Sequence, residues 1–147
     1  MKNLVFLVFM LILTACNSQK KYTNFDYSYA RSGGNKPFYE NLWIKGNSAK
    51  YAYESEGRIA ENKFTLSDET LENIQKTLYE NNFRTIEEDR KKIYDHISTI
   101  IVVRKGANSA SKSNASLIME KDTQRWNNVA AVFEEIITSN INQNSEK

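Results

Sequence analysis

Residues 38–56 have the sequence FYENLWIKGNSAKYAYESE, in which two alternating runs flank Gly46-Asn47. Glycine at the first central position of a two-residue loop is typical of a type II′ turn, whose twist suits antiparallel strands. The flanking runs alternate apolar with polar side chains, as expected of strands that bury one face. We therefore expect a β-hairpin of residues 38–45 and 49–56, and the rest of the chain is interpreted around it.

The two-residue turn also fixes which residues face each other across the hairpin. Because opposed residues lie on the same side of a sheet, the register separates two faces. The expected pairs are Lys45–Ser48, Trp43–Lys50, Leu42–Tyr51, Glu40–Tyr53 and Tyr39–Glu54. The face expected to meet the core carries Phe38, Leu42, Ile44, Tyr51 and Tyr53. The opposite, amphipathic face carries Tyr39 and Trp43 among Asn41, Lys50 and Glu54.

Segments next to the hairpin predict two further strands and a helix. Aromatic residues alternate with small or polar ones over 25–30, and a Ser-Gly-Gly-Asn turn follows. Residues 58–66 predict another strand after Gly57. Ser67 is a suitable N-cap for a helix, since its hydroxyl can accept from a free backbone N–H. The apolar residues of this helix are Leu71, Ile74 and Leu78, and its expected stop is Asn81-Asn82.

The second half of the chain predicts an interior strand and a long final helix. Residues 97–104 contain a β-branched run that is apolar on both faces, which is typical of an interior strand. A helix is expected over 123–140, with one apolar face formed by Trp126, Val129, Ala130, Phe133, Ile136, Ile137 and Ile141. The remaining expectations are a short strand at 83–86, a charged connector at 87–92, an exposed loop at 106–114 and a strand at 115–120.

This order of elements predicts an α+β fold. An antiparallel sheet of about five or six strands would carry two helices packed on one face. The chain has 147 residues, and its length and composition favour a single globular domain over residues 25–141, followed by a polar tail at 142–147.

The first residues have the pattern of a secretory signal. Lys2 supplies a positive charge, and residues 4–13 are the unbroken apolar run LVFLVFMLIL. A transmembrane helix needs about 20 apolar residues, and this run gives way sooner to polar residues. The end of the run, Leu13-Thr14-Ala15-Cys16, resembles the lipobox of bacterial lipoproteins, with an aliphatic residue, two small residues and a cysteine.

Resemblance to the lipoprotein class implies a defined processing and a membrane partner. A signal peptidase would recognise Leu13, Thr14 and Ala15, and diacylglycerol would be attached to Cys16. Each buried CH₂ contributes about 0.8 kcal/mol, so two or three acyl chains anchor a protein durably. The expected organisation is a signal peptide at 1–15 and a lipidated tether at 16–24. An ordinary secretory signal with an incidental cysteine, or an N-terminal apolar helix, are the alternatives left open.

The residue after the cysteine bears on which membrane is involved. In lipoproteins of the proteobacterial type, aspartate at this position favours retention in the inner membrane, whereas this chain has Asn17. The resemblance therefore implies a periplasm-facing site on the outer membrane. In a host with one membrane, the expected site is the outer face of the cytoplasmic membrane.

Charge and composition exclude several other kinds of partner. The formal net charge is +2, and acidic and basic residues are interspersed, so nucleic acid is not an expected partner. Cys16 is the only cysteine and His96 the only histidine, so neither a metal site nor a bound cofactor is expected. A lone histidine is usually solvated or hydrogen-bonded, and we expect the same of His96.

Two patterns resemble catalytic elements without their context. Ser109 and Lys112 have the Ser-x-x-Lys spacing of penicillin-binding enzymes, but the partner motifs and the supporting helix are missing. Glu54 and Glu56 lie two residues apart on an expected strand, about 7 Å between Cα atoms, which is compatible with a glycosidase pair. The register places both carboxylates outward in solvent, so no catalytic residue is expected.

Tyr39, Trp43, Lys50 and Glu54 are the remaining candidate site. If no helix or terminus covers them, exposed Trp and Tyr rings beside charges resemble a patch for a partner. The leading hypothesis is a non-catalytic lipoprotein that binds an envelope protein, as an accessory, inhibitor or immunity factor. Binding of a small ligand or glycan at the same aromatic residues is the alternative, and an unrecognised hydrolase is a third.

Overall fold

The hairpin around Gly46-Asn47 joins strand β2 (Phe38–Lys45) to strand β3 (Ser48–Ser55) in the computed structural model. Every residue pair expected across the hairpin is formed. The φ angle of Gly46 is +60° while that of Asn47 is negative, as a type II′ turn requires. The predicted turn and register are therefore confirmed.

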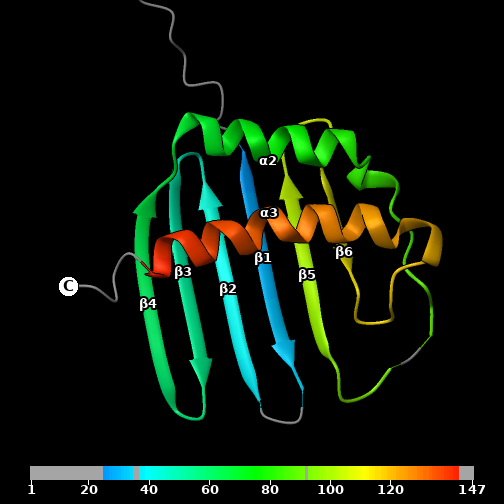
Figure 1. Cartoon of the computed structure of the whole chain (residues 1–147), viewed down its shortest axis with the longest axis horizontal. Coiled ribbons are helices and arrows are strands. Elements are labelled where there is room, and N and C mark those ends of the chain that lie inside the picture. The colour runs from blue at the N-terminus through cyan, green and yellow to red at the C-terminus, as the bar shows by residue number, and fades with distance from the viewer. Residues whose placement is uncertain (1–24, 35–36, 92, 143–147) are drawn as a thin grey trace, which may run out of the picture.

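Six strands form one antiparallel sheet in the order β4-β3-β2-β1-β5-β6 (Figure 1). The structure describes residues 25–34, 37–91 and 93–142. Strands β1 to β4 form a meander, and the chain then crosses the sheet to place β5 and β6 beside β1. The other bounds are β1 (Asp26–Gly33), β4 (Arg58–Thr65), α2 (Asp68–Glu80), η1 (Phe83–Thr85), β5 (Ile97–Arg104), β6 (Ala110–Ser113), η2 (Glu120–Asp122) and α3 (Thr123–Asn142).

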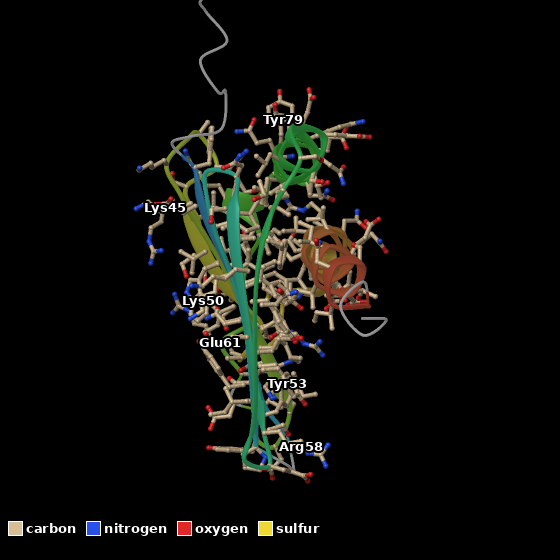
Figure 2. The ribbon with its side chains drawn as sticks, turned by 90° about the vertical axis from the view of Figure 1, so that its left-hand side faces the viewer. Lys45, Lys50, Tyr53, Arg58, Glu61 and Tyr79 are labelled. Carbon is tan, nitrogen blue, oxygen red and sulfur yellow. The ribbon has the colours of Figure 1, made fainter. Side chains whose placement is uncertain are left out.

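Helices α2 and α3 pack on the same side of the sheet, and no described helix lies on the other side (Figures 1 and 2). The predicted α+β fold with two helices on one face is confirmed. Helix α2 begins as expected, because the Thr70 N–H donates to Ser67 Oγ at 3.1 Å. It ends before Asn82, whose φ of +45° lies in the left-handed region.

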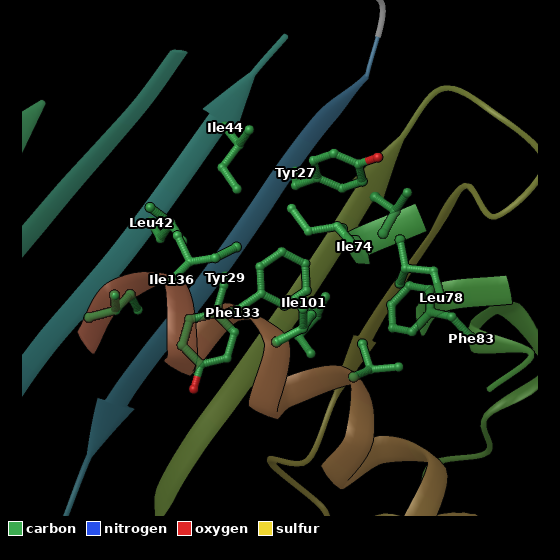
Figure 3. Close-up of a cluster of buried hydrophobic side chains, with 14 of the residues drawn as sticks. Tyr27, Tyr29, Leu42, Ile44, Ile74, Leu78, Phe83, Ile101, Phe133 and Ile136 are labelled. Atoms are coloured by element: carbon green, nitrogen blue, oxygen red, sulfur yellow. The ribbon is translucent and has the colours of Figure 1, made fainter. Parts of the chain in front are cut away.

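The core lies between the helices and the side of the sheet that faces them (Figure 3). Tyr29 of β1 is fully buried there, and its ring stacks on Phe133 of α3 with centroids 5.6 Å apart. Of the expected apolar face of α3, Ala130 and Ile141 are partly buried, and the rest are buried, namely Trp126, Val129, Phe133, Ile136 and Ile137. The helical period of these residues therefore correctly identified the packing face.

Three expectations for the second half are wrong. The expected strand at 83–86 is replaced by the 3₁₀ helix η1 over Phe83–Thr85, because the fully buried Phe83 packs into the core directly after α2. A strand, β6, forms within the expected loop, because Ala110 to Ser113 pair with the edge of β5. Residues 115–120 form no strand beyond a single bridge to Glu88, since Leu117 has a φ of +69° that interrupts an extended chain.

Two further differences concern β1 and β5. Strand β1 continues to Gly33, so Ser32 and Gly33 of the expected turn motif lie on the strand. Strand β5 is interior, as predicted, between β1 and β6. Only one of its faces is buried, however, and Ile100 on the other face is 41% exposed. The apolar character of both faces therefore reflects an open sheet surface rather than a second covering layer.

Candidate functional site

The side of the sheet opposite α2 and α3 is the candidate site, and we call it the open face. Figure 2 shows the sheet on edge, with Lys45, Lys50 and Glu61 projecting away from the helices. The strand registers place alternate residues of all six strands on this side. Its central members are Ser28, Ala30, Tyr39, Asn41, Trp43, Lys50, Ala52, Glu54, Ile59, Glu61, Ile100 and Val102.

Tyr39 and Trp43 are exposed on the open face, by 41% and 40% respectively. Asn41 lies between them on the same strand and is only 5% exposed. Its Nδ2 donates to the Tyr39 hydroxyl at 2.6 Å, and its Oδ1 accepts from Ser28 Oγ at 3.5 Å. The Tyr39 ring is thus tied to the sheet by its own neighbour. A held aromatic ring loses little conformational entropy when a partner binds.

The two charged members of the expected patch are placed differently. Lys50 lies opposite Trp43 as predicted, but its ammonium pairs with Glu61 Oε1 on β4 at 2.8 Å. This contact lowers the pKa of the Glu61 carboxyl below its usual value, first through the hydrogen bond and then through the charge of Lys50. Glu54 is exposed opposite Tyr39 and forms no ion pair with Lys50. The structure therefore adds Glu61 to the patch.

Apolar exposure extends beyond the expected patch. Ile59 on β4 is 73% exposed, and Ile100 on β5 is 41% exposed. The row of paired residues that starts at Ile100 contains the small side chains Ala30 and Ala52 and ends at Glu61, and Ile59 lies in the neighbouring row. The face thus offers apolar groups across most of its width, with charges interspersed. A shallow pocket of about 450 Å³ lies at one end, lined by Pro37, Phe38, Tyr39, Glu54, Ser55, Glu56 and Gly57.

The residues that resemble catalytic elements are not assembled into a site. A ring nitrogen of His96, Nε2, lies 3.2 Å from the Asn114 carbonyl oxygen, which fits the expected hydrogen-bonded role. The Ser109 hydroxyl donates to the Gly106 carbonyl at 2.8 Å within its own turn. Glu54 is exposed on β3, and Glu56 lies in the following turn rather than on the strand. Within the described ranges, no group of three or more acidic, histidine or cysteine side chains is placed to hold a metal ion.

A buried polar network on the helix side was missed by sequence reasoning. Glu40 of β2 accepts from the Tyr51 hydroxyl at 2.9 Å and pairs with Arg31 Nη1 at 3.3 Å. Nearby, the Tyr29 hydroxyl donates to Glu134 Oε1 of α3 at 2.7 Å. Burial, followed by the hydrogen bond to a carboxylate, raises the pKa of both tyrosines far above the ordinary value.

Tyr29 and Tyr51 therefore stay neutral donors at physiological pH, and their arrangement is structural. The signal was present in the sequence, since Glu40 occupies a core-facing position among Phe38, Leu42 and Ile44. A carboxylate at such a position requires partners, because an unpaired buried charge is very costly.

The expected anchor residues lie outside the described part of the chain. These are Leu13, Thr14, Ala15 and Cys16, together with the tether to residue 24. Neither α2 nor α3 is long and apolar enough to cross a membrane, and no other described helix is. Comparison of the sequence with known proteins finds no matching family model and no similar curated protein.

Proposed function

We propose that this chain is a lipid-anchored, non-catalytic module of the bacterial cell envelope that binds another envelope protein through the open face. Lipid on Cys16 would hold it at the membrane after cleavage behind Leu13-Thr14-Ala15. The outer membrane, facing the periplasm, is the proposed location, or the outer face of the cytoplasmic membrane in a single-membrane host. An accessory, inhibitor or immunity role fits such a module.

The observation that carries this proposal is the exposure of Tyr39 and Trp43 on a sheet face that no described helix covers. Exposed aromatic rings are enriched among the residues that dominate protein interfaces. Asn41 fixes one of these rings, and the apolar groups continue to Ile59 and Ile100. A broad, flat surface of this kind suits a protein surface better than a small molecule, which usually needs a deep cavity.

Site-specific photo-crosslinking in native membranes tests the protein partner. A photoreactive amino acid replaces Trp43 in one variant and Tyr79 in the matched control. Tyr79 is 76% exposed but lies on α2, on the other side of the molecule (Figure 2). We expect a discrete crosslinked protein from position 43 and not from position 79. Identical products from both positions, or none from position 43, would contradict the proposal.

The anchor is tested separately by Cys16→Ser. We expect the wild-type chain to incorporate labelled palmitate and to sediment with membranes, because several acyl chains bind durably. The Cys16→Ser chain should lose the label and remain uncleaved by the lipoprotein signal peptidase. A wild-type chain without covalent lipid would overturn the anchoring part of the proposal and leave the open face to be judged by crosslinking.

A second candidate is glycan or small-ligand binding at the pocket beside Tyr39. The pocket, about 450 Å³, has Phe38 and Tyr39 for stacking and Glu54 for hydrogen bonds. Soluble envelope oligosaccharides added during NMR titration should then shift resonances of this pocket, and Tyr39→Ala should abolish the shifts. Shifts confined to other surfaces would exclude this candidate.

A further inference from the structure

The two edges of the sheet are not alike. At one edge, β6 spans only Ala110–Ser113, and the backbone N–H of Ser113 donates to Glu88 Oε1 at 2.6 Å. The charged connector at 87–92 also approaches this edge, since its Glu88 forms a β-bridge with Ile118. Short strands and covering segments are the usual protection of a sheet edge. The β6 edge is therefore protected.

The opposite edge, β4, is long, and no strand in the described part of the chain pairs with its outer side. It runs over Arg58–Thr65 and pairs along its whole length with β3 on one side. It contains neither proline nor a bulge. In a two-residue hairpin the residues flanking the turn form a hydrogen-bonded pair, here Ser55 with Arg58. The N–H and C=O groups of Ile59, Glu61, Lys63 and Thr65 consequently point away from β3, toward the free edge.

The charges on this edge are complementary to a second copy of the same strand. Hydrogen bonding between two such edges requires an outward-pointing residue opposite another one. The register centred on Asn62 meets this condition, and its pairs are Ile59–Thr65, Ala60–Phe64, Glu61–Lys63 and Asn62–Asn62. It places Glu61 against Lys63 twice. The neighbouring registers instead oppose Glu61 to Glu61 or Lys63 to Lys63, which is unfavourable.

The local electrostatics of one chain favour the same register. Lys63 lies directly opposite Lys50 on β3, a like-charge neighbour. Lys50 is compensated by Glu61, whereas Lys63 forms no salt bridge with any residue in the described part of the chain. In the register centred on Asn62, Glu61 of the second copy lies beside Lys63. The pairing would thus bring a second carboxylate close to Lys63, whose charge in the single chain acts on Glu61 without forming a salt bridge.

We propose that β4 is a homodimer interface, in which two copies pair their edges antiparallel about a two-fold axis at Asn62. The two sheets then form one continuous sheet, with both open faces on the same side. This interface is formed by the backbone edge of β4, although the side chains of Ile59 and Glu61 also belong to the open face. Its failure would leave the function proposed above intact.

Cysteine crosslinking of the full-length chain in its native membrane tests the register. Residues opposite each other in a non-hydrogen-bonded pair have Cα atoms about 4.5 Å apart, within disulfide range. Asn62→Cys should therefore form disulfide-linked dimers under mild oxidation. Ile59→Cys is the matched control, because Ile59 is highly exposed yet its two copies would lie about 20 Å apart along the strands. The parent chain, with Cys16 alone, sets the background.

Charge exchange provides a second test that does not depend on disulfide geometry. Glu61→Lys and Lys63→Glu should each weaken self-association about tenfold or more in analytical ultracentrifugation, because both symmetric pairs become repulsive. The double exchange Glu61→Lys/Lys63→Glu restores attraction and should restore the dimer. Circular dichroism confirms that each variant is folded.

Three outcomes would overturn the proposal. The first is a chain that remains monomeric at about 100 µM, roughly a hundredfold above a micromolar Kd. The second is equal crosslinking of Asn62→Cys and Ile59→Cys, which would indicate random contact or a different interface. The third is crosslinking of Asn62→Cys to a different protein without dimer, which would indicate an edge that accepts a foreign strand.

Discussion

The Tyr51 hydroxyl donates a 2.9 Å hydrogen bond to Glu40 across the β2–β3 pair, and Arg31 reaches the same carboxylate from β1 at 3.3 Å. Three adjacent strands are thereby linked on the core side by one buried acid. In the intact network the Glu40 carboxylate has both a hydrogen-bond donor and a positive charge beside it. Removing either partner would leave its negative charge poorly compensated. The hairpin that carries the open face is held in register by this network as well as by its turn.

Tyr51→Phe should destabilise the fold by about 1–2 kcal/mol, because it removes a hydrogen bond to a charged group without leaving a cavity. Urea unfolding at neutral pH measures the loss. Tyr53→Phe is the control, since Tyr53 lies on the same strand and face, packed against Phe38. Equal stability of Tyr51→Phe and wild type would show that the Glu40 bond contributes nothing.

Stability should also fall in strong alkali. The pKa of Tyr29 and of Tyr51 is raised in the folded state, mainly by burial. Their contribution is therefore complete below about pH 10, the pKa of unfolded tyrosine, and is lost as pH rises beyond it. Urea midpoints at pH 8 and pH 11 check this. The double variant Tyr29→Phe/Tyr51→Phe should show a smaller decrease between these two pH values, and an unchanged decrease would exclude these tyrosines as its cause.

Asp122 should govern part of the stability at acid pH. Its buried carboxylate accepts from Arg125 Nε at 3.2 Å and from the Glu87 N–H at 2.8 Å, while Arg125 Nη1 also reaches the Asn81 carbonyl at 3.2 Å. The bond from Arg125, followed by the bond from Glu87, lowers the pKa of Asp122 despite burial. This stabilisation is present above about pH 4 and is lost as pH falls below it.

Asp122→Asn should accordingly lower the free energy of unfolding by about 2–3 kcal/mol at pH 7. The difference from wild type should shrink between about pH 4 and pH 2, where the wild-type carboxylate is protonated. A difference that stays constant over this range would indicate that the charge of Asp122 is not the source of its effect. Chemical unfolding at each pH provides the measurement.

Gly33 and Gly57 offer a matched pair for backbone effects. Both have positive φ, +107° and +76°, but a Cβ on Gly33 would lie 2.7 Å from the His96 carbonyl oxygen, whereas one on Gly57 meets nothing within 4 Å. Gly57→Ala should cost about 1–2 kcal/mol from the left-handed conformation alone. Gly33→Ala should lower the free energy of unfolding by a larger amount, because the backbone at His96 must also move to make room for the new Cβ. Equal thermal unfolding midpoints for the two variants would refute the steric contribution.

The sequence predicted the turn and the register of the hairpin because alternation and turn chemistry both act over a few residues, although the second strand is Ser48–Ser55 rather than 49–56. The period of Leu71, Ile74 and Leu78 identified the buried face of α2 for the same reason. Strand β6 escaped notice because Ala-Ser-Lys-Ser has little strand preference, and its pairing depends on the distant edge of β5. The alternation of side chains along β2 predicted that Tyr39 and Trp43 lie on the side away from the core. Their exposure depends in addition on where α2 and α3 pack.

Surface labelling of Trp43 in its native membrane is the decisive measurement for the proposed open-face partner. Side chains are oxidised with hydroxyl radicals, and mass spectrometry measures the extent of oxidation. Three samples are compared: the purified chain, the chain in protein-free liposomes and the chain in native membranes. We expect Trp43 to be oxidised in the first two samples and protected in the third, while Tyr79 on α2 is oxidised in all three. Equal oxidation of Trp43 in all three samples would contradict a protein partner on the open face, and protection already in liposomes would assign that face to the lipid surface.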